Sequence, residues 1–513
     1  MNKQSTLIPY MKTFLLFDPC IKILTLYSFL FFSANAQQIT FEKKYDYSFH
    51  AEGGSDLVQT SDDGYMIAGT QGIAINYINL LTMKTDSMGI EQWHTFTGSG
   101  NEWVQIRIAQ LNDTVFYTAG NSNAFTGNPA DRDFLLIKMD NNGDTIWTKN
   151  YGSNQNESMF DFKATSDNGL ILAGTSAISG QPAFFVKTNL NGDTLWTRTW
   201  VGPYSGANNY AIIQTSDGGY LSTGATLYPN PVDSNHYETM FLLKMDSMGI
   251  VQWSKFFPHD TVGSTNGYDI LQLPDSGYIV IGNKSTYNPQ TFLYDWDNYL
   301  VRTNSAGDTI WTSVTGGLNS DYFKQGVLTG SNEFVVTGTT LNNPNAPNGD
   351  ILIQKFSVNS PLVWSRTYGD SSDDQSYNII QTSDQGYAII GYSFGTCPGC
   401  VYLIKTDSFG CVVPGCQLSI IEEPGNKETE FNIYPNPADD QLTVFCKQTL
   451  AADLEIDFTD AFGRQVNLPG KNSAFNGNNS ITFNVNNVTP GLYFLKIENK
   501  KTRKYFLKKI VIN

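Results

Sequence analysis

One ten-residue sequence recurs along the chain, and this repetition constrains the fold more than any other feature. It reads KTDSMGIEQW at residues 84–93 and KMDSMGIVQW at residues 244–253. Looser copies begin at residues 138, 187, 302, 355 and 405. Six of the seven copies end in Trp, and consecutive Trp residues of the repeat lie 49 to 58 positions apart. A repeat of about fifty residues indicates a propeller or a solenoid rather than a domain with a single core.

Most repeats carry a second turn upstream of the first, as in SDGGY at residues 216–220 and SDQGY at residues 383–387. In both turns an Asp or Asn bonds the backbone ahead of it, and a Gly takes the positive φ that closes a hairpin. The turns separate four short strand patterns per repeat, which is the content of one propeller blade. The sequence therefore predicts an all-β fold, with a seven-bladed β-propeller over residues 37–416.

The two ends of the repeat region predict how the last blade is completed. The seventh copy has Pro414 where the others have Trp, so its outermost strand is missing. Near the N-terminus, ITFEKKYDYS resembles IWTKNYGS at residues 146–153, with Phe41 matching Trp147 and Tyr45 matching Tyr151. We expect the N-terminal strand to close the last blade, which leaves no unpaired sheet edge between the first and last blades.

The turn followed by Trp resembles the tryptophan-docking repeat of quinoprotein propellers, although that repeat usually has one more residue between Asp and Gly. The resemblance implies that the repeated Trp residues hold neighbouring blades together.

The first 36 residues have the pattern of a secretory signal peptide. Basic residues precede the apolar run at 23–32, and Ala34 and Ala36 occupy the small-residue positions of a cleavage site. The run is about half of the roughly 20 residues that span a bilayer. We therefore predict a cleaved signal over residues 1–36, a mature chain that begins at Gln37, and no transmembrane anchor.

The repeat ends before a polar linker at residues 417–430, and period-two alternation follows over residues 431–513. Such alternation predicts a compact antiparallel module, a small Ig-like β-sandwich.

This C-terminal module contains, in order, YPNP at 434–437, DAFGR at 460–464, PGLYFLKI at 490–497 and KKIVI at 508–512. With these motifs it closely resembles the type A sorting domain of the type IX secretion system. The resemblance implies that the type IX translocon and sorting machinery are partners after Sec export, and that the protein is secreted or held on the outer cell surface. An ordinary accessory domain is the alternative. The residues to which the resemblance assigns a sorting role are Tyr434, Pro435, Asn436, Pro437, Gly491, Lys508 and Lys509.

Four cysteines, Cys397, Cys400, Cys411 and Cys416, cluster at the end of the repeat region. They have a spacing that a zinc site also uses, but export to an oxidising compartment favours two disulfides. Four cysteines allow three pairings, and the sequence does not choose among them. The turn DNNGD at residues 140–144 lacks the further carboxylates of an EF-hand calcium loop, and we predict no metal and no cofactor.

The candidate ligand-binding residues lie in two long segments, 225–239 and 283–298, which we interpret as loops on the face opposite the repeated turns. Loops that vary on a repeated scaffold commonly form binding surfaces. Aromatic rings beside carboxylates suit the stacking and hydrogen bonding of a sugar. The candidates are Tyr228, His236, Tyr237, Tyr287, Tyr294, Asp295, Trp296 and Asp297.

The charge and motif content narrow the class of function. A formal net charge of -16 argues against a nucleic acid partner. Only four His are present, and no metalloprotease, nucleophile-elbow or phosphate-loop motif occurs. We predict a monomeric, non-catalytic binding or adhesion module for glycans or proteins. One alternative is a polysaccharide hydrolase or lyase that uses loop carboxylates such as Asp295 and Asp297, and another is a structural surface-layer component.

Overall fold

The computed structural model describes residues 39–416 and 431–512, with short gaps of which the longest are 124–131 and 467–479. Residues 1–36 and 417–430, where the signal peptide and the linker are predicted, lie outside the described residues. The named elements of the described residues are all β-strands. They form seven four-stranded antiparallel sheets, followed in the chain by two three-stranded sheets.

Each of the first six four-stranded sheets, or blades, is built from four consecutive strands in their chain order. The first and second blades are β2 (Glu52–Gln59), β3 (Tyr65–Ala74), β4 (Tyr77–Thr85), β5 (Glu91–Thr97) and β6 (Val104–Asn112), β7 (Val115–Ser122), β8 (Asp133–Asp140), β9 (Thr145–Tyr151). The third and fourth are β10 (Glu157–Thr165), β11 (Gly169–Ser176), β12 (Ala183–Asn189), β13 (Thr194–Trp200) and β14 (Ser205–Gln214), β15 (Tyr220–Pro229), β16 (His236–Met245), β17 (Val251–Phe257). The fifth and sixth are β18 (Thr265–Gln272), β19 (Tyr278–Asn288), β20 (Leu293–Thr303), β21 (Thr309–Thr315) and β22 (Asp321–Leu328), β23 (Glu333–Thr340), β24 (Asp350–Ser357), β25 (Leu362–Tyr368).

The seventh blade takes its fourth strand from the other end of the chain. It contains β26 (Asp373–Gln381), β27 (Tyr387–Phe394) and β28 (Cys400–Thr406), and β1 (Phe41–Tyr45) pairs antiparallel with β28. The register places Phe41 opposite Lys405 and Tyr45 opposite Val401. The predicted pairing of the N-terminal strand with the last blade is therefore present.

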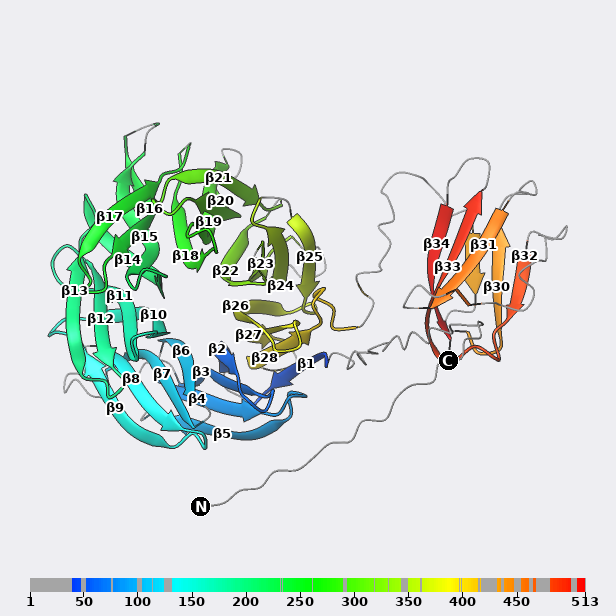
Figure 1. Ribbon diagram of the computed structural model, residues 1–513, viewed down its shortest axis with the longest axis horizontal. Helices are drawn as coiled ribbons and strands as arrows, with labels where there is room; N and C mark the ends of the chain where they lie inside the picture. The colour runs from blue at the N-terminus through cyan, green and yellow to red at the C-terminus, as the bar shows by residue number, and fades with distance from the viewer. Residues whose placement is uncertain are drawn as a thin grey trace, which may run out of the picture. The chain divides into compact units, whose positions relative to one another are not determined.

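Apolar cores form between consecutive blades, as expected for a propeller. The core between the third and fourth blades, for example, joins Ile171 and Phe185 to Phe241 and Leu243. A further core joins residues of the first blade such as Leu57 to residues of the seventh such as Leu403. Figure 1 shows the seven blades placed around an axis, with β2, β6, β10, β14, β18, β22 and β26 innermost. The predicted fold class, a seven-bladed β-propeller, is confirmed.

The repeated turns owe their sequence to backbone hydrogen bonding. In the turn after β8, Asp140 Oδ1 accepts the N–H groups of Asn142 at 2.9 Å and Asp144 at 3.0 Å, while Gly143 has a φ of 83°. The turn after β4 has the same arrangement around Asp86. Asp140, the first residue of DNNGD, thus stabilises the hairpin turn by accepting its backbone N–H groups.

The Trp that ends each repeat packs against the next blade. A Cβ atom placed on Gly192, in the turn after β12, would lie only 2.8 Å from the ring of Trp147 in the preceding blade. Gly249 stands in the same relation to Trp196. Phe41 occupies this place against Gly89, so the last blade contacts the first as the other blades contact each other.

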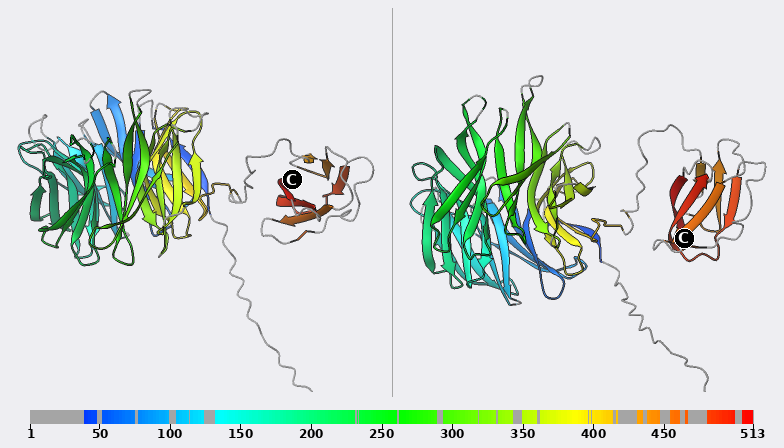
Figure 2. Two further views of the ribbon diagram at one scale, coloured as in Figure 1. Left: turned by 90° about the horizontal axis from the view of Figure 1, so that it is seen from above. Right: turned by 45° about the horizontal axis from the view of Figure 1, so that its top comes forward.

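A basic residue begins every copy of the repeat, and in the first copy it connects two turns. Lys84 Nζ lies 2.8 Å from Asp62 Oδ2, in the turn after β2, and donates to Thr85 O at 2.7 Å beside the turn after β4. Both turns therefore lie on one face of the propeller, which we call the turn face. The second-to-third strand hairpins and the connections between blades lie on the opposite face, the loop face; the strands run between the two faces in Figure 2.

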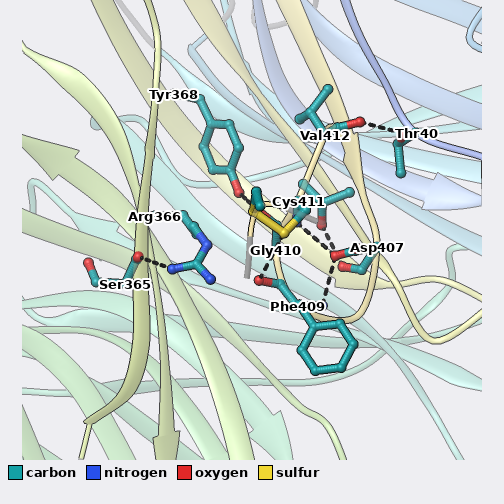
Figure 3. Close-up of a disulfide and its surroundings, with 11 residues drawn as sticks. Thr40, Ser365, Arg366, Tyr368, Asp407, Phe409, Gly410, Cys411 and Val412 are labelled. Atoms are coloured by element: carbon teal, nitrogen blue, oxygen red, sulfur yellow. Dashed lines mark hydrogen bonds between the residues drawn. A yellow bond between two sulfur atoms is a disulfide. The ribbon is translucent and has the colours of Figure 1, made fainter. Parts of the chain in front are cut away.

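Two disulfides form at the predicted cysteines: Cys397–Cys400 lies between β27 and β28 of the seventh blade, and Cys411–Cys416 follows β28. Figure 3 shows the second of these beside the turn in which Asp407 Oδ1 accepts the N–H of Cys411 at 2.8 Å. It lies where the other blades begin their fourth strand.

The C-terminal module has two three-stranded sheets. One contains β29 (Phe431–Tyr434), β30 (Gln441–Cys446) and β32 (Ser480–Asn484), and the other contains β31 (Leu454–Asp460), β33 (Gly491–Asn499) and β34 (Tyr505–Ile512). Residues from both sheets, such as Val444 and Leu495, share one buried core, so the module is a β-sandwich. Tyr434 and Lys508 are exposed, Gly491 begins β33, and Lys509 lies in β34. Pro435, Asn436 and Pro437 lie outside the described residues.

Candidate functional site

A cavity of about 710 Å³ lies at the axis of the propeller. The innermost strand of every blade contributes a lining residue, so the cavity exists only where all seven blades meet. These residues are Ser55, Arg107, Phe160, Tyr210, Tyr268, Lys324 and Tyr377.

Backbone irregularities direct all of these side chains except Arg107 to the axis. The pairing of β18 with β19 skips Tyr268, and the pairing of β22 with β23 skips Lys324. Ser55, Phe160 and Tyr210 are skipped in the same way in their own blades. A β-bulge breaks the strict alternation of a strand and re-aims one side chain. The skipped residues thus face the cavity while their neighbours pack between blades.

Aromatic rings form a continuous arc along one side of the cavity. The ring of Phe160 meets that of Tyr210 edge to face, with centroids 5.0 Å apart. Tyr210 and Tyr268 stack at 5.2 Å with an interplanar angle of 21°. Lys324 Nζ then lies 5.0 Å from the centroid of the Tyr268 ring. We call Phe160, Tyr210 and Tyr268 the aromatic arc.

The opposite side of the cavity reaches the loop face. Tyr377 contacts Tyr392 at 5.8 Å between centroids, and Tyr392 contacts Phe394 at 5.1 Å. Phe394 ends β27 on the loop face and is exposed. The first blade contributes the small residues Gly53 and Ser55 from β2, together with Glu52, Thr70 and Ile78.

A layer of buried carboxylates lies next to the bulges and links the innermost strands. Asp161 Oδ2 accepts the N–H of Ile212 in the next blade at 2.9 Å. Asp269 bonds the N–H of Gly326 in the same way, also at 2.9 Å. Burial raises the pKa of Asp269 to about 6. These carboxylates hold neighbouring blades in register at the axis.

Basic residues balance this layer. Lys163 Nζ lies 3.0 Å from Asp161 Oδ1, and Arg107 Nε lies 3.6 Å from the same oxygen. Burial by itself lowers the pKa of Lys163, but the charges of Asp161 and Asp269 outweigh burial and raise that pKa. Lys163 and Arg107 therefore belong to the structural layer through their contacts with Asp161.

Lys324 differs from these two residues. Among the described residues, no carboxylate oxygen lies within 4.0 Å of its Nζ atom. Burial lowers the pKa of Lys324, and the positive charge of Arg107 lowers it further. The cavity thus has an electropositive side that no neighbouring acid neutralises.

The phenols of the cavity are neutral at physiological pH. Burial raises the pKa of Tyr268 to about 12 and raises the pKa of both Tyr210 and Tyr377. A neutral phenol donates one hydrogen bond and accepts others. The aromatic walls therefore also offer hydrogen-bonding groups.

The residues predicted from the sequence lie elsewhere on the loop face. The interpretation of 225–239 and 283–298 as loops was wrong, because strands extend into both segments. β15 continues to Pro229 and β16 begins at His236, which places Tyr228 opposite Tyr237. Long hairpins are favoured there because cross-strand side-chain pairs stabilise them.

The second predicted segment is also a hairpin, formed by β19 and β20. Tyr287 lies opposite Tyr294, and their ring centroids are 5.4 Å apart. Both rings are exposed.

The first hairpin carries an aromatic cluster that the sequence predicted only in part. Tyr204, which the prediction missed, packs against Tyr228 at 5.6 Å and against His236 at 4.8 Å. Tyr228 also stacks on Phe256 at 4.7 Å. None of the eight predicted residues is among the described residues that line the axial cavity. Their role in ligand binding stays a prediction.

The predicted acid–base pair lies on β20. Asp295 Oδ1 accepts the Oγ–H of Ser320 at 2.8 Å and the backbone N–H of Trp296 at 3.1 Å. Burial raises the pKa of Asp297, and the charges of Asp295 and Asp321 raise it further.

The described residues contain no group of three or more His, Cys, Asp or Glu placed to hold a metal ion. In the same part of the chain, no helix is long and apolar enough to cross a membrane.

Comparison with protein families assigns the C-terminal sandwich. Residues 432–513 match the family described as "Secretion system C-terminal sorting domain". The sandwich is a secretion system sorting domain. The resemblance inferred from YPNP, DAFGR, PGLYFLKI and KKIVI is therefore confirmed. The sorting domain contains β30 to β34 in full and most of β29. Among curated proteins, none matches this sequence.

Solved structures similar to this chain share little sequence with it. A polysaccharide lyase, PL25 ulvan lyase, matches with 7% identity over 72% of this chain and 97% of its own, at a TM-score of 0.47. Sqt1 from Chaetomium thermophilum matches with 9% identity over 72% and 99% of the two chains, at a TM-score of 0.41. The Pan2 WD40 domain of Neurospora crassa matches with 8% identity over 69% and 89%, at a TM-score of 0.42. Likeness at this level transfers no ligand and no activity.

Proposed function

We propose that this protein is exported by the type IX secretion system and that its propeller binds a carbohydrate, without turnover, in the axial cavity. The aromatic arc of Phe160, Tyr210 and Tyr268 is the observation that carries the proposal. The sorting domain implies export to the cell surface or secretion.

The size and lining of the cavity support a saccharide ligand. Small-molecule sites commonly have volumes of about 300–1,000 Å³, mostly apolar walls and a few polar groups that fix the orientation of the ligand. A cavity of about 710 Å³ falls within that range. A sugar ring has apolar faces that suit the stacked rings of Tyr210 and Tyr268. Its hydroxyl groups would bond the neutral phenols and Ser55.

The export route also determines the proposed organisation of the chain. Residues 1–36 would be the Sec signal, residues 37–416 the binding domain and residues 417–430 a linker to the sorting domain. We propose a monomeric binding domain that the type IX machinery delivers to the medium or to the outer cell surface.

Affinity electrophoresis tests the proposed function. Residues 37–513 would be run through native gels containing different polysaccharides, beside the variants Tyr268→Ala and Trp296→Ala. We expect at least one polysaccharide to retard the parent protein. Tyr268→Ala should lose that retardation, whereas Trp296→Ala should keep it. No retardation on any gel would overturn carbohydrate binding, and loss only in Trp296→Ala would move the site to the hairpin β19–β20.

A polysaccharide hydrolase or lyase is the second candidate function, and the raised pKa of Asp297 beside Asp295 favours it. A carboxyl group with a raised pKa near a second carboxyl group is the usual arrangement for acid–base cleavage of a glycosidic bond. Release of reducing ends or unsaturated products that Asp297→Asn abolishes would support it. If the protein showed neither binding nor turnover, that result would favour a structural surface-layer role.

A further inference from the structure

We infer that the axial cavity recognises an anionic group on its saccharide ligand, a carboxylate or a sulfate, held by Lys324, with Arg107 lining the same cavity. This inference rests on the proposed function, because it names the class of saccharide that the cavity takes.

Lys324 is placed to bind an anion, and the part of the chain that the structure describes supplies no acid within 4.0 Å of its Nζ atom. The bulge in β22 directs it to the axis, where its Nζ atom lies 5.0 Å from the Tyr268 centroid. Other buried lysines of the propeller are paired: Lys187 lies 2.9 Å from Asp167, and Lys405 lies 2.9 Å from Asp384. A half-buried cation without an acid partner costs free energy that a bound anion would offset.

Arg107 adds a second positive charge to the same cavity. It aligns with Asp56, Asp161 and Asp269 of other innermost strands, so the sign of the charge is reversed at this position of the second blade. The charge of Arg107 reaches Lys324, because it lowers the pKa of that lysine. Arg107 is already held by Asp161 at 3.6 Å, so Lys324 supplies the unpaired charge and Arg107 adds to the positive potential around it.

The acids near the cavity do not remove this preference. Glu52 is the only carboxylate among the described lining residues, and 2% of it is exposed. In other blades, the acid at the strand position equivalent to Glu52 accepts a backbone N–H from the connection that precedes its strand. Glu157 accepts the N–H of Ser153, and Asp374 accepts that of Asp370, each at 3.0 Å. These two carboxylates therefore face the connections between blades, and Glu52, which occupies the same position in its own blade, lies at the edge of the cavity where its blade begins.

The net charge of the chain, -16, bears on where an anionic ligand is recognised. Surface charges are screened beyond about 8 Å at physiological ionic strength, so groups inside the cavity decide the local interaction. Because Lys324 sits over Tyr268, a ring stacked on the arc would bring its charged substituent to the lysine. The site thus fits a uronate or a sulfated sugar better than a neutral one.

The test compares matched ligands by isothermal titration of residues 37–513. Oligomannuronate is paired with neutral mannan oligosaccharides, and sulfated carrageenan oligosaccharides are paired with neutral agarose oligosaccharides. We expect at least one anionic ligand to bind about tenfold or more tightly than its neutral partner, since a hydrogen bond between two charged groups is stronger than one between neutral groups. Raising the salt concentration should weaken that binding.

Three variants assign the effect to the cavity. Lys324→Met keeps the apolar stem and should abolish the preference for the anionic ligand, while Lys324→Arg should retain it. Lys255 lies on the outermost strand of the fourth blade, is partly exposed and is paired with Asp308. Lys255→Met should therefore leave the preference for the anionic ligand unchanged. Unchanged melting temperatures would show that each variant is folded.

The outcomes separate the inference from the proposed function. Binding of uronate but not sulfate, or the reverse, supports the inference and identifies the anionic group. Equal binding of neutral and anionic ligands, or an anionic preference that survives in Lys324→Met, overturns the inference and leaves carbohydrate binding intact. Failure of every ligand to bind would overturn both.

Discussion

Replacing Gly192 by Ala should destabilise the propeller more than the same change at Gly218, although both glycines have similar backbone angles. Their φ values are 75° and 79°. A Cβ on Gly192 would lie 2.8 Å from both the Trp147 ring and Lys149 Cδ, whereas a Cβ on Gly218 would meet nothing within 4 Å. The pair therefore separates the cost of the backbone conformation from the cost of the contact between blades.

The expected magnitudes follow from these two costs. Ala in the left-handed region costs about 1–2 kcal/mol, which the lower entropy of the unfolded chain offsets in part. Gly218→Ala should thus lose about 1 kcal/mol. Crowding a packed site adds roughly 1–3 kcal/mol, so Gly192→Ala should lose about 2–4 kcal/mol.

Urea unfolding followed by tryptophan fluorescence measures this difference. All nine Trp residues precede residue 365, so the signal reports the propeller and not the sorting domain. Equal losses in the two variants would refute the reasoning, because the Trp–Gly contact would then add nothing to the backbone cost.

Further predictions concern the disulfide, the axial carboxylates and export. Replacing both Cys411 and Cys416 by Ser should lower the free energy of unfolding by about 2 kcal/mol for so short a loop; an unchanged urea midpoint would contradict this. Burial raises the pKa of Asp269 from 3.8 to about 6, so the native state binds this proton more tightly than the unfolded chain does. The stability contribution of Asp269 therefore falls as the pH rises from about 4 to 6, by about 3 kcal/mol. Asp269→Asn should remove that part of the pH dependence, which urea unfolding at several pH values would measure. Deleting residues 504–513 removes β34 and should leave the protein in the periplasm; its normal appearance in the medium on cell fractionation would exclude the sorting role.

The propeller could be predicted from the sequence because its governing contacts are local and repeated. Most turns have an Asx residue and a Gly within a few positions, and five of the six repeat Trp residues fit under the Gly of the next blade. The completion of the last blade by the N-terminal strand could also be predicted from the sequence. Tyr45 donates its hydroxyl to Gly89 O at 2.6 Å, as Tyr151 does to Gly192 O at 2.7 Å, so the matched residues make matched contacts.

The axial cavity could not be predicted in the same way. Tyr210 lies in a strand whose neighbours, such as Ile212, are buried, and strict alternation gives no reason to direct it to the axis. The bulge that does so depends on how β14 pairs with β15, which a single strand pattern does not contain. One signal was present: aligned on their innermost strands, the repeats place Ser55, Tyr268 and Lys324 in one column, and residues so different do not share one packing role.

The prediction that the two hairpins of the loop face are loops was wrong for a related reason. Asn and Pro in residues 225–239 favour turns, yet the turn that forms is short and the flanking residues continue the strands. Whether a strand continues past the core depends on its partner strand, because each added residue gains a cross-strand pair. Tyr228 and Tyr237 supply such a pair.

The contrast between the two faces explains why the repeats of this chain differ from one another mainly at the axis and on the loop face. On the turn face, the carboxylate of Asp62 already meets Lys84, and that of Asp86 meets the N–H groups of its own turn. A substitution there breaks a link within or between hairpins. A bulge residue at the axis contacts no core, because its strand neighbours do the packing between blades. Lys324 can therefore stand where Tyr268 stands in the preceding blade without disturbing either sheet, and such a position is where a repeated scaffold acquires a ligand.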